Sequence, residues 1–324
     1  MIISKTPYRI PLTGGGTDLD FYYKKKNGSL YSLAINQYVY VHLHNRKVDK
    51  NYLLQTTTTQ FANKITSINH SLIRETLKYF RLKEKLHIAT YSTVPTNTGL
   101  GTSSAMIVGL INCIRKFKNL KINDKKVIKI AFKIERKICN QYGGWQDQVI
   151  SQTGGLAKID ISKNENIKIK KYQLNKLIEK KIKTNFLLVY TTKKRNSSRV
   201  ALSQKKRKSE IIFYYDKIKS LNKEFFFAMK NKNPKFIAEI FNLHWQYKKK
   251  LSNKMTSLSI NKLYSKLMKN YNFLGGKLIG AGGGGFFLMI TPNKKKTISL
   301  LEKDKISYLD LKMENLGSRI IESI

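Results

Sequence analysis

The residues best suited to chemistry lie in a glycine turn that runs straight into a helical pattern. Residues 95–105 read PTNTGLGTSSA, and apolar residues then recur at helical intervals as far as Phe117. Such a turn leaves backbone N–H groups unpaired at the positive end of the helix dipole, where they bind anions. Hydroxyl groups at the helix start can also reach a Mg²⁺ that bridges nucleotide phosphates. The segment predicts a phosphate site, although a capped helix after a glycine turn gives the same pattern.

Two further glycine stretches support the phosphate interpretation. Residues 11–18 read PLTGGGTD, and residues 280–285 read GAGGGG. Glycine lets the backbone turn sharply and approach a ligand closely, so three such stretches indicate backbone amides wrapped around a phosphate. The loop at 95–105 is neither a Walker A loop nor the dinucleotide fingerprint, because the Gly-Lys-Ser/Thr and G-x-G-x-x-G spacings are missing from it.

Hydrophobic periodicity predicts the elements that position these stretches. We expect strands over residues 1–12, 30–43, 86–91 and 185–190, helices over 103–117 and 127–142, a mostly helical segment over 197–270, and a strand, a turn and a further strand or helix over 278–290. Strands and helices are mixed rather than strictly alternating, which favours an α+β fold. A chain of 324 residues suits two domains, which we place at 1–175 and 176–324.

The composition excludes several classes of protein. A hydrophobic fraction of 41% is typical of a globular chain, and no stretch approaches the ~18 uninterrupted apolar residues of a membrane span. The first residues carry no apolar signal segment, so we expect a cytoplasmic protein that does not bind a membrane. The net charge of +42 invites a nucleic-acid partner, but the lysines are spread along the whole chain. Codon bias towards A and T explains the charge, because Lys, Ile, Asn, Tyr and Phe are all abundant, and we expect no nucleic-acid partner.

With these motifs in place, the chain resembles the GHMP kinases. Residues 95–105 are similar to the family's phosphate loop, P-x-x-x-G-L-G-S-S-A, with Thr102 where Ser is usual, and the other glycine stretches stand where its first and third motifs stand. The resemblance spans essentially the whole chain and is closest to the D-glycero-D-manno-heptose 7-phosphate kinase branch, through residues 9–18, 143–148, 190–198 and 274–285. It implies a two-domain fold, with an N-terminal domain like ribosomal protein S5 domain 2 and a ferredoxin-like C-terminal domain.

The resemblance also implies the residues of a kinase site that uses ATP and Mg²⁺. Asp147, in a GGWQDQ turn after a helix, corresponds to the catalytic base, and Arg9 corresponds to a basic residue placed beside it. Glu135, twelve residues earlier on the predicted helix 127–142, is the expected Mg²⁺ ligand, although its basic neighbours Arg136 and Lys137 also suit an ordinary exposed helix. Ser103 or Ser104 is the second ligand, and the spacing leaves both open. The ATP-binding loop is predicted to comprise Pro95, Gly99, Leu100, Gly101, Thr102, Ser103 and Ser104.

The acceptor site is expected around the first and third glycine stretches. The resemblance places Gly15, Gly16, Thr17, Asp18, Gly144, Gly283 and Gly284 there. Arg195 is a further hypothesis, because a guanidinium could clamp a sugar phosphate, although a solvated basic loop is the alternative. None of the five histidines stands at the spacing of a metal site, and His244, next to Trp245, fits a core position.

These residues together predict an ATP-dependent sugar kinase. The specific expectation is phosphorylation of the anomeric hydroxyl of D-glycero-α-D-manno-heptose 7-phosphate to the 1,7-bisphosphate, for surface-glycan synthesis. Another sugar kinase of the family, similar to fucokinase or galactokinase, is the alternative within the class. A basic nucleic-acid-binding protein and a catalytically inactive nucleotide-binding relative are the alternatives outside it.

Overall fold

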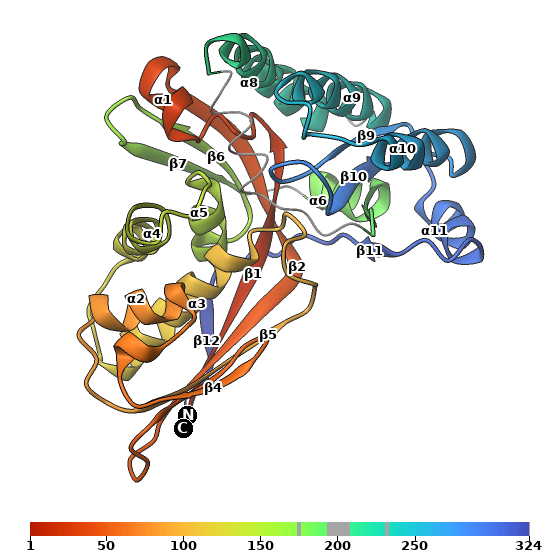
Figure 1. Ribbon diagram of the computed structural model, residues 1–324. Coiled ribbons are helices and arrows are strands. Elements are labelled where there is room, and N and C mark those ends of the chain that lie inside the picture. The colour runs from red at the N-terminus through yellow and green to blue at the C-terminus, as the bar shows by residue number, and fades with distance from the viewer. Residues whose placement is uncertain (174–175, 193–207, 231–232, 324) are drawn as a thin grey trace.

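The computed structural model describes residues 1–173, 176–192, 208–230 and 233–323. Two sheets and the helices packed on them form an α+β fold, as the sequence predicted (Figure 1).

The first sheet contains eight strands and is built around one long hairpin. Its main path runs β12-β1-β2-β5-β3-β4, and β6 and β7 continue from the other half of β2. The strands are β1 (Ile2–Thr13), β2 (Gly28–Asn45), β3 (Tyr52–Gln55), β4 (Thr59–Ala62), β5 (Leu86–Ser92), β6 (Leu156–Ile161), β7 (Ile167–Tyr172) and β12 (Arg319–Ser323). The length of β2 allows it to pair with β5 through one half and with β6 through the other.

The outer edge of β1 is where the site is assembled. Strand β12 covers this edge only from Ile2 to Lys5. Further along, Pro7 and Pro11 stand on β1, which is the edge position that a residue without an N–H group tolerates. The polar groups of this edge are met by other segments: the Arg9 N–H donates to the Leu100 carbonyl at 3.2 Å, and the Pro7 carbonyl accepts from Ser151 Oγ at 3.0 Å. The phosphate loop is thereby fixed directly against β1.

Helices cover one face of the first sheet (Figure 1). They are α2 (Ser71–Tyr79), α3 (Thr102–Phe117), α4 (Asp124–Phe132), the π-helix η2 (Lys133–Ile138) and α5 (Gln146–Thr153), while α1 (Asp20–Lys26) and the short η1 (Ile65–Ser67) lie in connections. Helix α3 is buried almost all round and packs on β1 and β2, so its first turn is held rigidly.

The second sheet is antiparallel, with the order β11-β8-β10-β9. Its strands are β8 (Phe186–Tyr190), β9 (Gly275–Leu278), β10 (Phe286–Ile290) and β11 (Tyr308–Asp310), and its helices are α6 (Lys176–Asn185), α8 (Lys208–Lys230), α9 (Pro234–Lys250), α10 (Leu258–Asn270) and α11 (Lys294–Lys303). Alternate residues of β8 enter different cores: Leu188 packs in the large core shared with the first sheet, and Leu187 packs in a core with α9 and α10. This two-sided burial explains the continuous apolar run of β8.

One predicted element needs correction, one prediction with two alternatives is decided, and the division into two domains remains a proposal. The helix expected over 127–142 begins at Asp124, and its α geometry ends at Phe132, where the π-helix takes over. The segment around Gly280 is strand–turn–strand, which is one of the two alternatives that the sequence left open. Residues 319–323 pair with β1 of the first sheet, although the division at 175/176 assigns them to the second domain. The two domains therefore stay a proposal.

Candidate active site

A single cleft of about 1490 Å³ lies between the glycine stretches, α5 and α9. This volume exceeds the usual size of a site for one small ligand and suits two substrates held together. The sequence-predicted residues that line it are Arg9, Gly15, Gly16, Asp18, Pro95, Gly99, Gly101, Thr102, Ser103, Gly144 and Asp147.

The phosphate loop enters α3 through a left-handed residue. Gly101 caps the helix at φ +79°, and a Cβ there would lie 3.4 Å from both Arg9 Cζ and Asp147 Cγ. The first backbone bond of the helix runs from the Ala105 N–H to the Gly101 carbonyl at 3.0 Å, so the amides of residues 102–104 lie before it at the positive helix end. The Leu100 side chain is fully buried in the core, so only its backbone can contribute to this turn.

The predicted base and its basic partner form a buried ion pair at the mouth of this turn. Arg9 Nε and Nη2 lie 2.6 and 2.5 Å from Asp147 Oδ1, and Nη1 donates to the Gly99 carbonyl at 2.7 Å. One guanidinium thus fixes the carboxylate relative to the phosphate loop. Asp147 lies in the first turn of α5 rather than in a free turn, and the helix dipole there favours a negative charge.

Glu135 is fully buried, and both candidate serines contact it. Ser103 Oγ donates to Glu135 Oε1 at 2.7 Å, and Ser104 Oγ donates to Oε2 at 2.6 Å. Gln148 Nε2 also donates to Oε2 at 2.6 Å. Ser103 lines the cleft, whereas Ser104 is fully buried behind it. A carboxylate beside hydroxyl oxygens is a donor set that suits a hard cation such as Mg²⁺.

Arg136 is a site residue that the sequence did not predict. Its Nη1 lies 3.3 Å from Glu135 Oε1, while Nη2 lies 3.4 Å from Asp147 Oδ2 and 3.1 Å from Ser104 Oγ. Glu135 and Arg136 both reach the site from the π-helix, whose i→i+5 bonds include Cys139 N–H to the Ile134 carbonyl. In the regular α-helix that the sequence predicted, Arg136 stands out only as the residue next to Glu135. The hydrophobic periodicity that predicted a helix over 127–142 does not indicate that part of it is a π-helix.

Asp18 lies on the acceptor side of the cleft and is held by α5. The Gln146 N–H donates to Asp18 Oδ2 at 3.1 Å, and Gln146 Nε2 lies 3.3 Å from Oδ1. Burial, and then the charge of Asp147, raise the pKa of Asp18 above its usual value. Gly144 permits this approach, because a Cβ there would lie 2.1 Å from Asp18 Oδ2. Thr17 supports the turn instead, since its hydroxyl donates to the Gly14 carbonyl.

The third glycine stretch closes over the phosphate loop. A Cβ on Gly285 would lie 2.1 Å from the Thr98 carbonyl oxygen, and Gly285 has φ +98°. The Gly283 N–H donates to the Met255 carbonyl at 2.9 Å, which ties the turn to the segment after α9. Gly284, next to it, is buried in the same turn. Arg195 lies outside the described residues.

Replacing Gly285 by alanine is expected to destabilise the protein by about 1–3 kcal/mol, because it adds left-handed strain and a clash with backbone. Urea unfolding followed by circular dichroism measures this. Gly155 also has a positive φ (+68°), but the nearest atom to a Cβ placed there would be Lys171 Cε, at 3.0 Å. Gly155→Ala is the matched control, because a flexible lysine end can move away. Equal losses in the two variants would contradict the packing role of Gly285.

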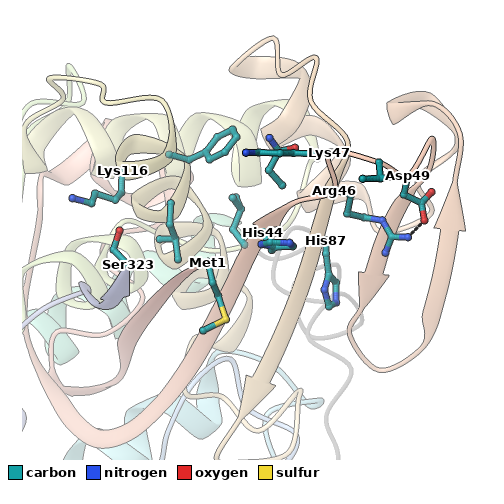
Figure 2. Close-up of a pocket in the computed structure, with 13 residues that line it drawn as sticks. Met1, His44, Arg46, Lys47, Asp49, His87, Lys116 and Ser323 are labelled. Atoms are coloured by element: carbon teal, nitrogen blue, oxygen red, sulfur yellow. Dashed lines mark hydrogen bonds and ion pairs between the residues drawn. The ribbon is translucent and has the colours of Figure 1, made fainter.

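A second pocket, of about 810 Å³, lies near the described ends of the chain (Figure 2). Figure 2 shows His44 and His87 close together and Arg46 paired with Asp49. None of the glycine stretches lines it. In the described part of the chain, no helix is long and apolar enough to cross a bilayer.

Comparison with known proteins matches one segment of this arrangement to a known family. Residues 66–155, which include the phosphate loop, Glu135 and Asp147, match the family model described as GHMP kinases N terminal domain. The D-glycero-alpha-D-manno-heptose 7-phosphate kinase of Campylobacter jejuni is 27% identical over 323 residues, with 94% of each chain covered. The bifunctional fucokinase/GDP-fucose pyrophosphorylase of Arabidopsis thaliana is 24% identical, over 71% of this chain and 22% of that protein.

The solved structures show that the fold extends over the whole chain. The crystal structure of a D-glycero-D-manno-heptose 1-phosphate kinase from Bacteroides thetaiotaomicron superposes with a TM-score of 0.82 at 21% identity and covers 100% of both chains. At this identity the likeness establishes the fold. The expected α+β fold is confirmed, and the family match lies within residues 66–155.

Proposed function

We propose that this chain phosphorylates the anomeric hydroxyl of D-glycero-α-D-manno-heptose 7-phosphate with ATP. It carries the N-terminal domain of the GHMP kinases and is a sugar kinase of that family. The proposal rests on one arrangement above all: the Arg9–Asp147 pair lies directly beside the start of α3 in the wall of the same cleft. The acceptor comes from the Campylobacter relative, whose similarity covers 94% of both chains.

Asp147 is proposed to receive the proton of the acceptor hydroxyl as its oxygen attacks the γ-phosphorus. The bond to the β–γ bridging oxygen breaks, and ADP leaves. Arg9 holds the carboxylate beside the phosphate loop, and an ionised carboxylate is the form that accepts a proton. The second guanidinium, Arg136, lies where it can stabilise negative charge on the transferred group.

The nucleotide phosphates are proposed to lie against the amides of residues 99–104 at the start of α3. Glu135 with Ser103 would hold Mg²⁺, and we favour Ser103 because it lines the cleft. Bound Mg²⁺ neutralises phosphate charge as it develops. Asp18, Gly15 and Gly16 are proposed to contact the sugar, with Asp18 accepting hydrogen bonds from its hydroxyls.

A substrate panel tests the proposed acceptor. The purified chain, ATP and Mg²⁺ are incubated with heptose 7-phosphate, unphosphorylated heptose, fucose, galactose and mevalonate, and ADP release is measured. The expected result is the highest kcat/KM for heptose 7-phosphate, with a 1,7-bisphosphate product identified by ³¹P NMR. A preference for fucose would replace the acceptor with that of the fucokinase relatives, and product phosphorylated elsewhere than the anomeric oxygen would contradict the proposed reaction.

A further inference from the structure

Three basic side chains on the acceptor side of the cleft have no part in the chemistry described above. His244 and Lys248 stand four residues apart on α9 and therefore share a helix face, and Lys277 comes from β9. All three line the cleft, and their exposed fractions are only 2%, 7% and 1%. Buried charged groups are costly unless they are paired or bind a ligand, so this group requires an explanation.

Both lysines donate to backbone carbonyl groups. Lys277 Nζ donates to the Pro11 carbonyl at 2.9 Å and lies 5.2 Å from the centroid of the Phe241 ring. Lys248 Nζ donates to the carbonyls of Leu278 and Gly280 at 2.8 and 2.6 Å. Among the described residues, no carboxylate forms an ion pair with Lys277. An ammonium group has three N–H donors, so Lys277 can still donate towards the cleft.

His244 is the least satisfied member of the group. Within the described part of the chain, neither ring nitrogen has a hydrogen-bond partner, although the ring is buried. Burial, and then the charges of Lys277 and Lys248, lower the pKa of His244 well below its usual value. Burial and the charge of Lys248 also lower the pKa of Lys277. Each of these effects would be reversed by an anion bound among the three side chains.

The group is continuous with the turn proposed to contact the sugar. Pro11, which holds Lys277, also packs under the first glycine turn, since a Cβ on Gly15 would lie 3.2 Å from Pro11 Cβ. Pro11, Gly15 and Gly16 line the same cleft as the three basic residues. An acceptor whose reacting hydroxyl faces Asp147 could therefore extend along this turn and place its far end beside Lys277.

We propose that His244, Lys248 and Lys277 form an anion subsite that binds the phosphate monoester of the acceptor. This inference rests on the proposed sugar-phosphate kinase activity and assigns the residues that distinguish a phosphorylated sugar from a free one. The phosphate oxygens accept hydrogen bonds from Lys277 Nζ and from a ring nitrogen of His244, and Lys248 contributes charge from the next turn of α9. Charge-assisted hydrogen bonds of this kind are stronger than neutral ones.

Kinetics of matched variants test the subsite. Lys277→Met and His244→Gln are expected to raise the KM for heptose 7-phosphate about ten- to a hundredfold more than the KM for unphosphorylated heptose, and to change kcat little. Lys250→Met is the control, because Lys250 is exposed on the same helix. The decisive quantity is the ratio of the KM for unphosphorylated heptose to the KM for heptose 7-phosphate. If this ratio were the same in Lys277→Met as in the unaltered chain, the proposal would be overturned.

Inhibition by inorganic phosphate is a second measurement, and it does not require the sugar substrate to be known. Phosphate is expected to compete with the sugar substrate but not with ATP, and Lys277→Met and His244→Gln should each weaken this competition at least tenfold. Competition with ATP alone would overturn the subsite, as would a preference for a sugar carboxylate over the sugar phosphate. The two proposals can fail separately. If the unaltered chain phosphorylates a different substrate and no sugar phosphate, the proposed function fails. If inorganic phosphate still competes with that substrate, the anion site remains.

Discussion

Replacing Asp147 by asparagine is expected to lower kcat by about 10²–10⁴-fold while the affinity for ATP stays nearly unchanged. The amide keeps the shape of the side chain and can still contact Arg9, but it cannot accept the proton of the acceptor hydroxyl. Steady-state kinetics and binding of a nonhydrolysable ATP analogue measure the two effects.

The matched control for this variant is Asp160→Asn. Asp160, on β6, accepts a hydrogen bond from Ser29 Oγ outside the residues that line the cleft, so its replacement should leave kcat within about twofold. If Asp147→Asn retained full kcat, the assignment of the base would be wrong. The change also removes one charge of the buried Arg9 pair, so we expect the melting temperature to fall. Kinetics measured well below that temperature separate the loss of the base from unfolding.

Replacing Arg9 by leucine is expected to have the largest effect on stability, because it breaks a buried ion pair. The change removes the shortest ion pair of Asp147, while the longer Arg136 contact stays, and it removes the donor to the Gly99 carbonyl. Loss of one partner of a buried pair typically costs about 3–5 kcal/mol, and Arg136 should keep this case near the lower figure. Urea unfolding measures the change, and kcat should fall with it because the carboxylate is no longer positioned.

Two further variants separate charge from geometry. Arg9→Lys retains the positive charge but cannot make the two-nitrogen contact with one carboxylate oxygen, so it should recover part of the stability and little of kcat. Arg115→Leu removes a half-exposed ion pair with Asp124, at 3.6 Å, and should cost at most about 1 kcal/mol. An Arg9→Leu loss no greater than that of Arg115→Leu would contradict a buried, structural pair.

The sequence predicted those features that depend on local pattern. The glycine turn and the apolar periodicity of α3 are adjacent in the chain, so the predicted helix 103–117 differs from α3 by a single residue at its start. The Arg9–Asp147 contact spans 138 residues. Periodicity cannot reveal such a contact, and the family resemblance supplied it.

The missed residues depend on geometry that no local pattern encodes. Arg136 reaches Asp147 because the helix widens into a π turn after Phe132. Lys277 and His244 meet only when β9 packs against α9, and the lysine-rich composition hid Lys248 and Lys277 among the many other lysines. The sequence predicted a core position for His244; the structure buries it but also places it in the wall of the cleft.

The return of residues 319–323 to β1 has a consequence for how the protein folds during synthesis. The first sheet is built mainly from residues 2–172, yet the outermost stretch of β1 stays uncovered until residues 319–323 leave the ribosome. An uncovered strand can pair with another chain, so a nascent or truncated protein should aggregate more readily than the full one. Strand β12 therefore covers, late in synthesis, the exposed edge of the strand that supplies Arg9.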